Sequence, residues 1–323
     1  MKQILASLSL CSLLLACGET TNPINYDTVD VEETVDETEE VAEVPEEEVL
    51  EEVVFNTLPE SIGGNLNRIT FNPTTETLQV DMTALDASEA LATYTRTPAL
   101  DQDGYLAYQV NEGNLQRTFT ALTRQSDRGT VLAAVVADGG QFNRRFGGGY
   151  YARLVPLTMP VPDGTPNSGL VTYTGDYIGL FTPGASSGIP GIPSEVDTAT
   201  NYRVTGDILL NASFADLAVN GAVFNRSAID ASGAEVFTLE SVALIYTDID
   251  EETGSFLGEV EFIAVDQNVI GNYGGAFAGT DASDVGGVLL INPIRDEDGM
   301  WENGAFVLGV CGMPGEGTLC AQN

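Results

Sequence analysis

The chain contains no histidine, and its only lysine is Lys2. Histidine is the commonest general base and metal ligand in proteins, so its absence excludes Ser-His-Asp and Cys-His catalytic sites, histidine-ligated haem and histidine zinc sites. Only 12 basic residues stand against 48 acidic ones. The resulting net charge of −36 repels nucleic acid and anionic lipid headgroups. The composition therefore excludes nucleic-acid binding.

Cysteine is scarce too, with four in 323 residues, and two of them lie in an apolar leader. Residues 1–16 carry one basic residue followed by an apolar run that is too short to span a bilayer as a stable helix, which predicts a secretory signal peptide. The end of the run, Leu14-Leu15-Ala16-Cys17, resembles the bacterial lipobox, in which the cysteine is acylated and becomes the mature N-terminus. We therefore predict lipidation at Cys17; an ordinary cleaved signal peptide is the alternative.

The residues next to Cys11 and Cys17 indicate which cysteine is lipidated and which membrane holds the protein. Cys11 competes with Cys17, but Leu10 before it is bulky where the lipoprotein peptidase needs a small residue. Gly18 follows Cys17 in place of the aspartate that typically retains enterobacterial lipoproteins in the inner membrane. Acyl chains contribute about 0.8 kcal/mol per buried CH₂, so several chains make a durable anchor. We expect a lipid-anchored protein of the outer membrane, at the cell surface or the periplasmic face.

Residues 17–56 differ sharply from the leader. Between Asp27 and Glu52 the chain is nearly all Asp, Glu, Val and Thr, and it has no cation. Like charges and few aromatic residues argue against a packed core, which predicts a disordered acidic tether. A flexible chain of about 40 residues has an r.m.s. span of roughly 30–40 Å. A calcium-loaded or partner-binding acidic arm is the alternative.

Residues 57–165 show alternating strand patterns separated by turn signals, which predicts a small, mostly antiparallel sheet domain. Ser88–Thr93 is the one segment here expected to form a helical turn. Four prolines between positions 156 and 166 predict a stiff connector. The expected strands are Leu66–Phe71, Thr77–Met82, Gly104–Val110, Gln116–Arg124, Val131–Ala137 and Gly147–Leu157.

Residues 166–323 are predicted to form an eight-stranded antiparallel β-barrel, so the expected fold class is all-β. Repeated glycine in Gly271–Ile291 indicates sharp curvature or close backbone approach, as closing a small barrel requires. Tyr202–Ala212 and Gly254–Ala264 alternate apolar with polar residues, which indicates antiparallel strands with one face in water. Acidic residues interrupt the strands, so a lipid-facing barrel is not expected. The eight runs are Leu170–Phe181, Tyr202–Ala212, Phe214–Phe224, Val236–Thr247, Gly254–Ala264, Asn272–Ala278, Val285–Ile291 and Gly304–Cys311.

The other two cysteines, Cys311 and Cys320, lie near the end of the chain. In an oxidising compartment a disulfide between them is the economical interpretation, and free thiols are the alternative. The bond closes a short loop, so it contributes about 2–3 kcal/mol at most. Two cysteines without another soft ligand do not predict a metal site.

Other chemical signals are weak. Three acidic segments, Asp101–Gly104, Asp248–Gly254 and Asp296–Gly299, resemble fragments of calcium loops, but none has glycine at position six and glutamate at position twelve. We therefore expect no metal and no cofactor. Nothing marks one carboxylate pair among 48 acids for glycoside hydrolysis. Trp301, the only tryptophan, is expected to plug one end of the barrel, and ligand stacking is the alternative.

Three segments, Tyr173–Gly179, Gly206–Ala222 and Asn272–Gly287, resemble the β-barrel domain of transferrin-binding protein B and its lipoprotein relatives. The last is similar to that family's glycine-rich hairpin, and residues 147–166 resemble the approach to the barrel. The resemblance implies a surface lipoprotein with a handle-like sheet domain before an eight-stranded barrel, which binds a protein or small ligand through loops. Transferrin-binding protein B has two such lobes and this chain has room for one. We therefore assign this chain neither transferrin as its ligand nor any of the family's ligand-contact residues.

We therefore predict a non-enzymatic binding module, with accessory work in nutrient or metal uptake as one interpretation and an outer-membrane receptor as a candidate partner. The ligand and its contact residues are unknown. The alternatives are a structural or adhesive envelope lipoprotein and a carboxylate-based hydrolase. A hydrophobic or arginine-bearing cleft between sheet domain and barrel would favour binding, uniformly polar short loops would favour the structural role, and two buried carboxylates facing each other would favour the hydrolase.

Overall fold

The structure is a computed structural model that describes residues 58–320, with gaps at 73, 84–88, 113–116, 139–145, 166, 184–195, 197–200, 264–267, 293–300 and 314–318. The predicted leader, the lipidation site Cys17 and the acidic tether lie outside the described residues. All described elements belong to one compact unit within residues 51–323. None of the described helices has the length and hydropathy of a membrane-spanning segment.

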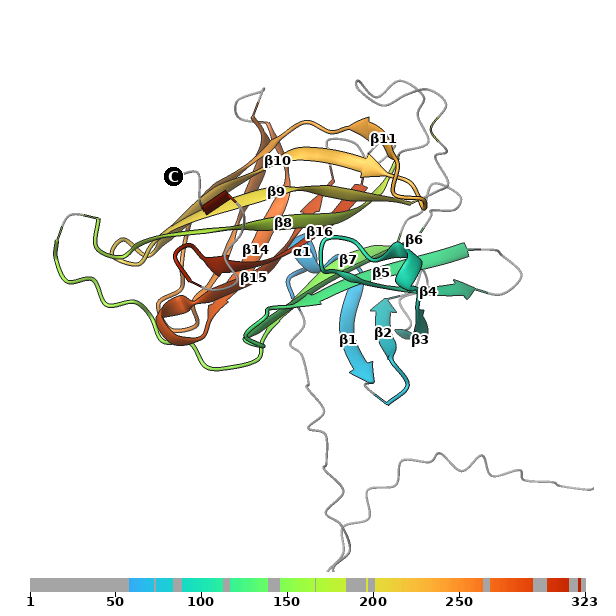
Figure 1. The fold of residues 1–323 in the computed structure, drawn as a ribbon, viewed down its shortest axis with the longest axis horizontal. Coiled ribbons are helices and arrows are strands. Elements are labelled where there is room, and N and C mark those ends of the chain that lie inside the picture. Colours follow the sequence, from blue (N-terminus) through green and yellow to red (C-terminus); the bar gives the residue numbers. More distant parts are fainter. Residues whose placement is uncertain are drawn as a thin grey trace, which may run out of the picture. The chain divides into compact units, whose positions relative to one another are not determined.

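The first half forms a seven-stranded antiparallel sheet in which each strand pairs with the next along the chain (Figure 1). A four-residue helix, α1 (Glu60–Gly63), precedes it, and a short 3₁₀ helix, η1 (Pro98–Leu100), follows the third strand. The predicted boundary at 165/166 lies between this sheet and the next. The strands are β1 (Leu66–Asn72), β2 (Thr77–Thr83), β3 (Glu89–Arg96), β4 (Leu106–Glu112), β5 (Arg117–Gln125), β6 (Val131–Asp138) and β7 (Gly147–Arg153).

The helical turn expected at Ser88–Thr93 is wrong, because this stretch enters β3. The alanines and the leucine there favour a helix locally, but Ala92 pairs with Val80 and Tyr94 is buried in the sheet. Tertiary pairing thus overrides local propensity. The strand expected over Gly147–Leu157 ends earlier, at Arg153, in accord with the missing N–H of Pro156.

Strand β6 explains how the sheet is packed, because both of its faces are buried. Its residues Val131, Ala133 and Val135 join a core shared with the barrel, which also contains Ile178 and Val288. On the opposite face, the intervening residues of β6 join a second core made within the sheet. A strand covered on both sides requires a near-continuous apolar run, which is what Val-Leu-Ala-Ala-Val-Val-Ala supplies.

The second half closes into the predicted eight-stranded antiparallel barrel. The circuit runs β8, β9, β10, β12, β13, β14, β15, β16 and back to β8, and the pairing of the last strand with the first is confirmed by Ala305 lying opposite Ile178. Strand β11 is an addition at the side of β10. The strands are β8 (Leu170–Thr182), β9 (Tyr202–Ser213), β10 (Ala218–Ile229), β11 (Glu235–Thr238), β12 (Val242–Asp248), β13 (Ser255–Phe262), β14 (Val269–Ala278), β15 (Asp284–Ile291) and β16 (Trp301–Val310).

The expected barrel strands differ from the observed ones by one to five residues at their ends, and two of them differ for an identifiable reason. The run Val236–Thr247 is divided between β11 and β12, with a break at residues 239–241. The run expected from Phe214 begins only at Ala218, because the preceding residues form a turn in which Leu217 has φ 52°. In both places apolar residues continue through a turn, so hydrophobicity alone does not mark the end of the strand.

Candidate functional site

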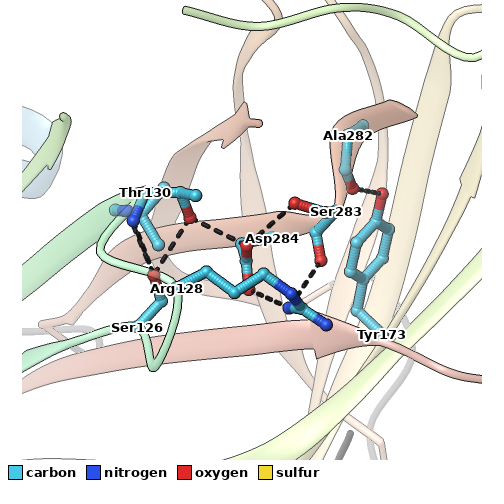
Figure 2. Close-up of polar contacts among 8 residues, drawn as sticks. Ser126, Arg128, Thr130, Tyr173, Ala282, Ser283 and Asp284 are labelled. Atoms are coloured by element: carbon cyan, nitrogen blue, oxygen red, sulfur yellow. Dashed lines mark hydrogen bonds and ion pairs between the residues drawn. The ribbon is translucent and has the colours of Figure 1, made fainter. Parts of the chain in front are cut away.

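The seam between the sheet and the barrel carries a partly buried ion pair (Figure 2). Arg128, in the β5–β6 turn, donates through Nη1 to Asp284 Oδ1 at 2.7 Å, at the start of β15. Thr130 Oγ1 and Ser283 Oγ donate to Asp284 Oδ2 at 2.8 and 2.9 Å. Because the one hydroxyl proton of Thr130 goes to the carboxylate, Ser126 Oγ is the donor in its 3.0 Å contact with Thr130.

This cluster is structural rather than catalytic. Asp284 is only 2% exposed, and both of its oxygens already accept hydrogen bonds. A carboxylate in that state is not available as a general base or as a metal ligand. The same turn is held from the barrel interior by Tyr173, whose hydroxyl donates to Ala282 O at 2.6 Å (Figure 2). Burial raises the pKa of Tyr173, so its hydroxyl remains a neutral donor.

Three further arginines cross the same seam, one from each of β5, β7 and β9. Arg124 lies 3.6 Å from the Asp176 carboxylate, at the solvent edge of the seam. The other two donate to backbone carbonyls: Arg153 to Phe277 O at 2.9 Å and to Thr253 O, and Arg203 to Leu100 O at 3.0 Å and Asp230 O at 2.7 Å. In a chain with so few cations, four arginines are thus used to join sheet and barrel.

Inside the barrel lies a second ion pair, which is fully buried. Arg226 of β10 donates to Glu302 of β16, and each side chain is at most 3% exposed. Tyr177 donates to the other Glu302 oxygen at 2.5 Å, and Arg226 also donates to Glu240 O at 2.5 Å. The buried carboxylates of the described residues, Asp138, Asp284 and Glu302, each accept hydrogen bonds from N–H or O–H donors. This is not the pair of facing carboxylates that a glycoside hydrolase would use.

A pocket of about 440 Å³ opens at the seam. One wall comes from the sheet half, with Pro59, Ile62 and Tyr151, and the other from the barrel. The barrel contributes three residues from the end of β12 and its turn and three from the start of β13: Asp248, Ile249, Asp250, Ser255, Phe256 and Leu257. This is the hydrophobic cleft between sheet domain and barrel that favours the binding hypothesis. Its size falls in the range of ligand sites.

A second, smaller pocket of about 260 Å³ lies on the barrel wall over β8, β9, β10 and β12. It is lined by the exposed apolar side chains Leu170 and Tyr246 together with uncharged polar residues such as Asn211. Its lining carries no charge, so it offers less discrimination between ligands than the seam pocket.

Two of the three acidic segments, Asp101–Gly104 and Asp248–Gly254, lie in the described part of the chain, and neither assembles a metal site there. No group of three or more metal-ligating side chains occurs among those residues. Asp101 binds the Arg96 guanidinium at 2.5–2.6 Å, and Asp250 accepts from Thr253 N at 2.6 Å within a tight turn. The hydrogen bonds from Thr253 lower the pKa of Asp250. The third segment, Asp296–Gly299, lies outside the described residues.

The remaining sequence-derived residues lie at the ends of the last strand. The structure joins Cys311 and Cys320 by a disulfide with a Cα–Cα distance of 5.3 Å. Thr174 of β8 lies 3.0 Å from Cys320 Sγ, so the bond holds the end of the chain against the barrel wall. Trp301 begins β16 opposite Thr182 and is half-buried.

Sequence reasoning missed the seam arginines and the pocket. The one available signal for the arginines was their scarcity: a rare cation in a strongly acidic chain is expected to have a structural partner. The sequence contains no local pattern that would indicate the pocket, because its walls come from segments that are up to nearly 200 positions apart.

No family model matches the sequence, and no curated protein matches it. Among solved structures, the chain is similar to transferrin binding protein B from Haemophilus parasuis Hp5, in a double-mutant form, with 12% identity and a TM-score of 0.37 over 75% of this chain and 52% of that one. It is also similar to the isotype 1 protein from serogroup B Neisseria meningitidis, with 12% identity and a TM-score of 0.34 over 76% and 52%. Intact Ap-TbpB, with its N and C lobes, gives 13% identity and a TM-score of 0.33 over 77% and 55%.

The chain spans about half the length of these solved chains.

Proposed function

We propose that this protein is a non-enzymatic binding lipoprotein, anchored to the outer membrane through Cys17, whose ligand enters the pocket at the seam of sheet and barrel. The observation that carries the proposal is the pocket itself. Its two walls come from halves that four arginines and a shared apolar core hold together. A rigid seam keeps such a pocket preformed, which lowers the cost of binding.

The competing functions are less well supported. A hydrolase needs a carboxylate pair with room for substrate, whereas Asp284 and Glu302 are buried and bound to arginines. A purely structural protein has no use for an apolar pocket with Leu257 45% exposed at its edge. Accessory work in nutrient or metal uptake, with an outer-membrane receptor as partner, remains the proposed context.

The binding test compares two substitutions that both introduce tryptophan, one inside the pocket and one outside it. Leu257→Trp fills the pocket, and Val269→Trp puts the same bulk on neighbouring β14, where the side chain is equally exposed and does not line the pocket. The full chain, expressed with its leader and extracted from envelopes, is used for affinity capture and mass spectrometry from iron-replete and iron-starved cultures. The proposal expects a molecule that the parent and Val269→Trp retain and Leu257→Trp loses. Identical retention by all three, or retention of nothing, contradicts it.

The anchor is tested separately by metabolic labelling with palmitate in a bacterial host. Cys17→Ser is expected to abolish the label, whereas Cys11→Ser is expected to leave it. Label that survives Cys17→Ser would show that the anchor is elsewhere or absent.

A further inference from the structure

The seam pocket combines an apolar floor with an acidic rim, and this combination defines its occupant. We infer that it receives a basic segment of a partner protein, in which an arginine or lysine side chain is flanked by apolar residues. The inference rests on the proposed binding function and names the chemistry of its ligand.

The accessible apolar surface of the floor comes from two side chains. Tyr151 is half-buried, and Leu257 is 45% exposed at the edge. Ile62, Ile249 and Phe256 are each at most 4% exposed and pack beneath them. Apolar surface that is left accessible in a concave site gains stability when a ligand covers it.

The rim is anionic. Asp248 and Asp250 line the pocket, and Glu251 and Glu252 in the same turn are exposed beside them. The hydrogen bonds from Thr253 lower the pKa of Asp250, so this carboxylate carries its charge at neutral pH. None of the residues that line the pocket is basic.

The nearest arginine on the sheet side offsets only part of the charge of this rim. Arg153 follows Tyr151 by two positions on β7 and donates to the carbonyl oxygens of Phe277 and Thr253. Thr253 lies in the same turn as Asp250, Glu251 and Glu252. One arginine against the four acidic side chains leaves a net negative charge at the rim, which an external cation can balance.

Lysine and arginine side chains fit both features at once. Their methylene stems pack on apolar surface while the charged head reaches solvent or a carboxylate. Here the stem would lie on Tyr151 and Leu257, and the head would reach Asp248 or Asp250. A guanidinium or ammonium group also interacts favourably with an aromatic face such as that of Tyr151.

The occupant comes from another protein rather than from a second copy of this chain or from a bare metal ion. This chain carries −36 net charge and only 12 basic residues, so two copies repel each other. Among the described residues no cluster of three metal-ligating side chains exists to hold a divalent cation. Charge complementarity with a basic partner instead speeds association and gives specificity.

The test uses short synthetic peptides as probes and calorimetry with the full chain in detergent. A peptide of alternating arginine and leucine is compared with one of glutamate and leucine, one of arginine and serine, and free arginine amide. The inference expects the arginine–leucine peptide to bind most tightly, and more weakly as salt rises. Equal binding of the arginine–serine peptide would show that the apolar floor is not used, and equal binding of arginine amide would point to a small amine. Either result overturns the inference.

Matched variants locate the binding. Asp248→Asn and Asp250→Asn each remove one rim charge, and the asparagine at 250 can still accept the hydrogen bonds of the turn. Each is expected to weaken binding roughly 1.5-fold to fivefold, the range of a partly exposed ion pair. Glu259→Gln removes the same charge from an exposed position on β13 outside the pocket and is expected to leave binding unchanged. An equal loss in all three variants would show attraction to the whole acidic surface and would overturn the inference.

The two proposals fail in different ways. If Leu257→Trp abolishes capture of a natural ligand but the arginine–leucine peptide does not bind, the pocket binds something of other chemistry and only the inference falls. If capture and peptide binding are both absent, the proposed function falls as well.

Discussion

Phe306 lies directly opposite Gly287 across the β15–β16 pair, and its ring fills the space where a side chain at 287 would stand. A Cβ at Gly287 would come within 2.3 Å of Phe306 Cζ and 2.4 Å of Gly274 O. Phe256 stands in the same relation to Gly275 across β13 and β14, at 2.6 Å. The glycines that weaken these strands locally thus accommodate aromatic rings in a narrow barrel interior.

Gly287→Ala is expected to destabilise the barrel by about 1–3 kcal/mol through overpacking, because neither the Phe306 ring nor the backbone of Gly274 can move freely. Gly286→Ala is the matched control: its Cβ would point to the seam and meet Val131 Cβ at 3.0 Å. We expect a smaller loss there. Urea unfolding of both variants measures the difference. Equal losses of stability would contradict the interpretation that Gly287 leaves room for the Phe306 ring.

Replacing Arg128 with methionine leaves the buried carboxylate of Asp284 without its cation. Breaking a buried pair costs about 3–5 kcal/mol, and we expect the lower end because the Arg128 side chain is 26% exposed. Arg96→Met removes a more exposed ion pair, with Asp101, and is expected to cost about 1 kcal/mol or less. Chemical denaturation compares the two. A loss for Arg128→Met no larger than that for Arg96→Met would show that the seam pair is not important for stability.

Arg226 and Glu302 are expected to be strongly coupled in the barrel interior. Glu302→Gln and Arg226→Met each leave a buried polar partner uncompensated and are expected to cost about 3–5 kcal/mol. The double variant leaves neither charge and is expected to be more stable than the sum of the two losses predicts. Unfolding free energies of the four proteins form the measurement. Additive losses would mean that the two side chains act independently.

Because several tyrosines are buried, we expect the protein to unfold cooperatively at alkaline pH. Burial disfavours the charged tyrosinate and raises the pKa of five of these side chains above its ordinary value near 10, namely Tyr105, Tyr150, Tyr173, Tyr177 and Tyr273. A group whose folded pKa is raised stabilises the fold fully below its unfolded pKa and loses that contribution as the pH rises through the folded value. Stability is therefore expected to fall above about pH 10.

Tyrosinate absorbance and circular dichroism, followed together from pH 9 upwards, check this expectation. The ionisation of most tyrosines should coincide with unfolding. Ionisation of all tyrosines well before any loss of structure would contradict the assignment of these hydroxyls to the interior.

Much of the fold was predictable because strand formation and chain reversal are encoded locally. Alternating apolar residues in β9 and β13, glycine in β14 and β15, and turn residues between them indicate antiparallel strands without reference to distant segments. The errors arose where local and tertiary preferences disagree. At β3, an alanine-rich stretch joins a sheet because its neighbours offer backbone partners, and at β11 and β12 one apolar run is divided by a turn.

By itself, the sequence determined the all-β class, the number of barrel strands, the excluded histidine chemistry and the strongly acidic character, since composition and short-range pattern are sufficient for each. Only the tertiary structure decided which charges meet and where a ligand can enter. Arg128 and Asp284 are separated by 156 positions, and the seam pocket is built from three distant segments. Such contacts depend on how two apolar faces pack together, and a single sequence carries no local signal for that packing.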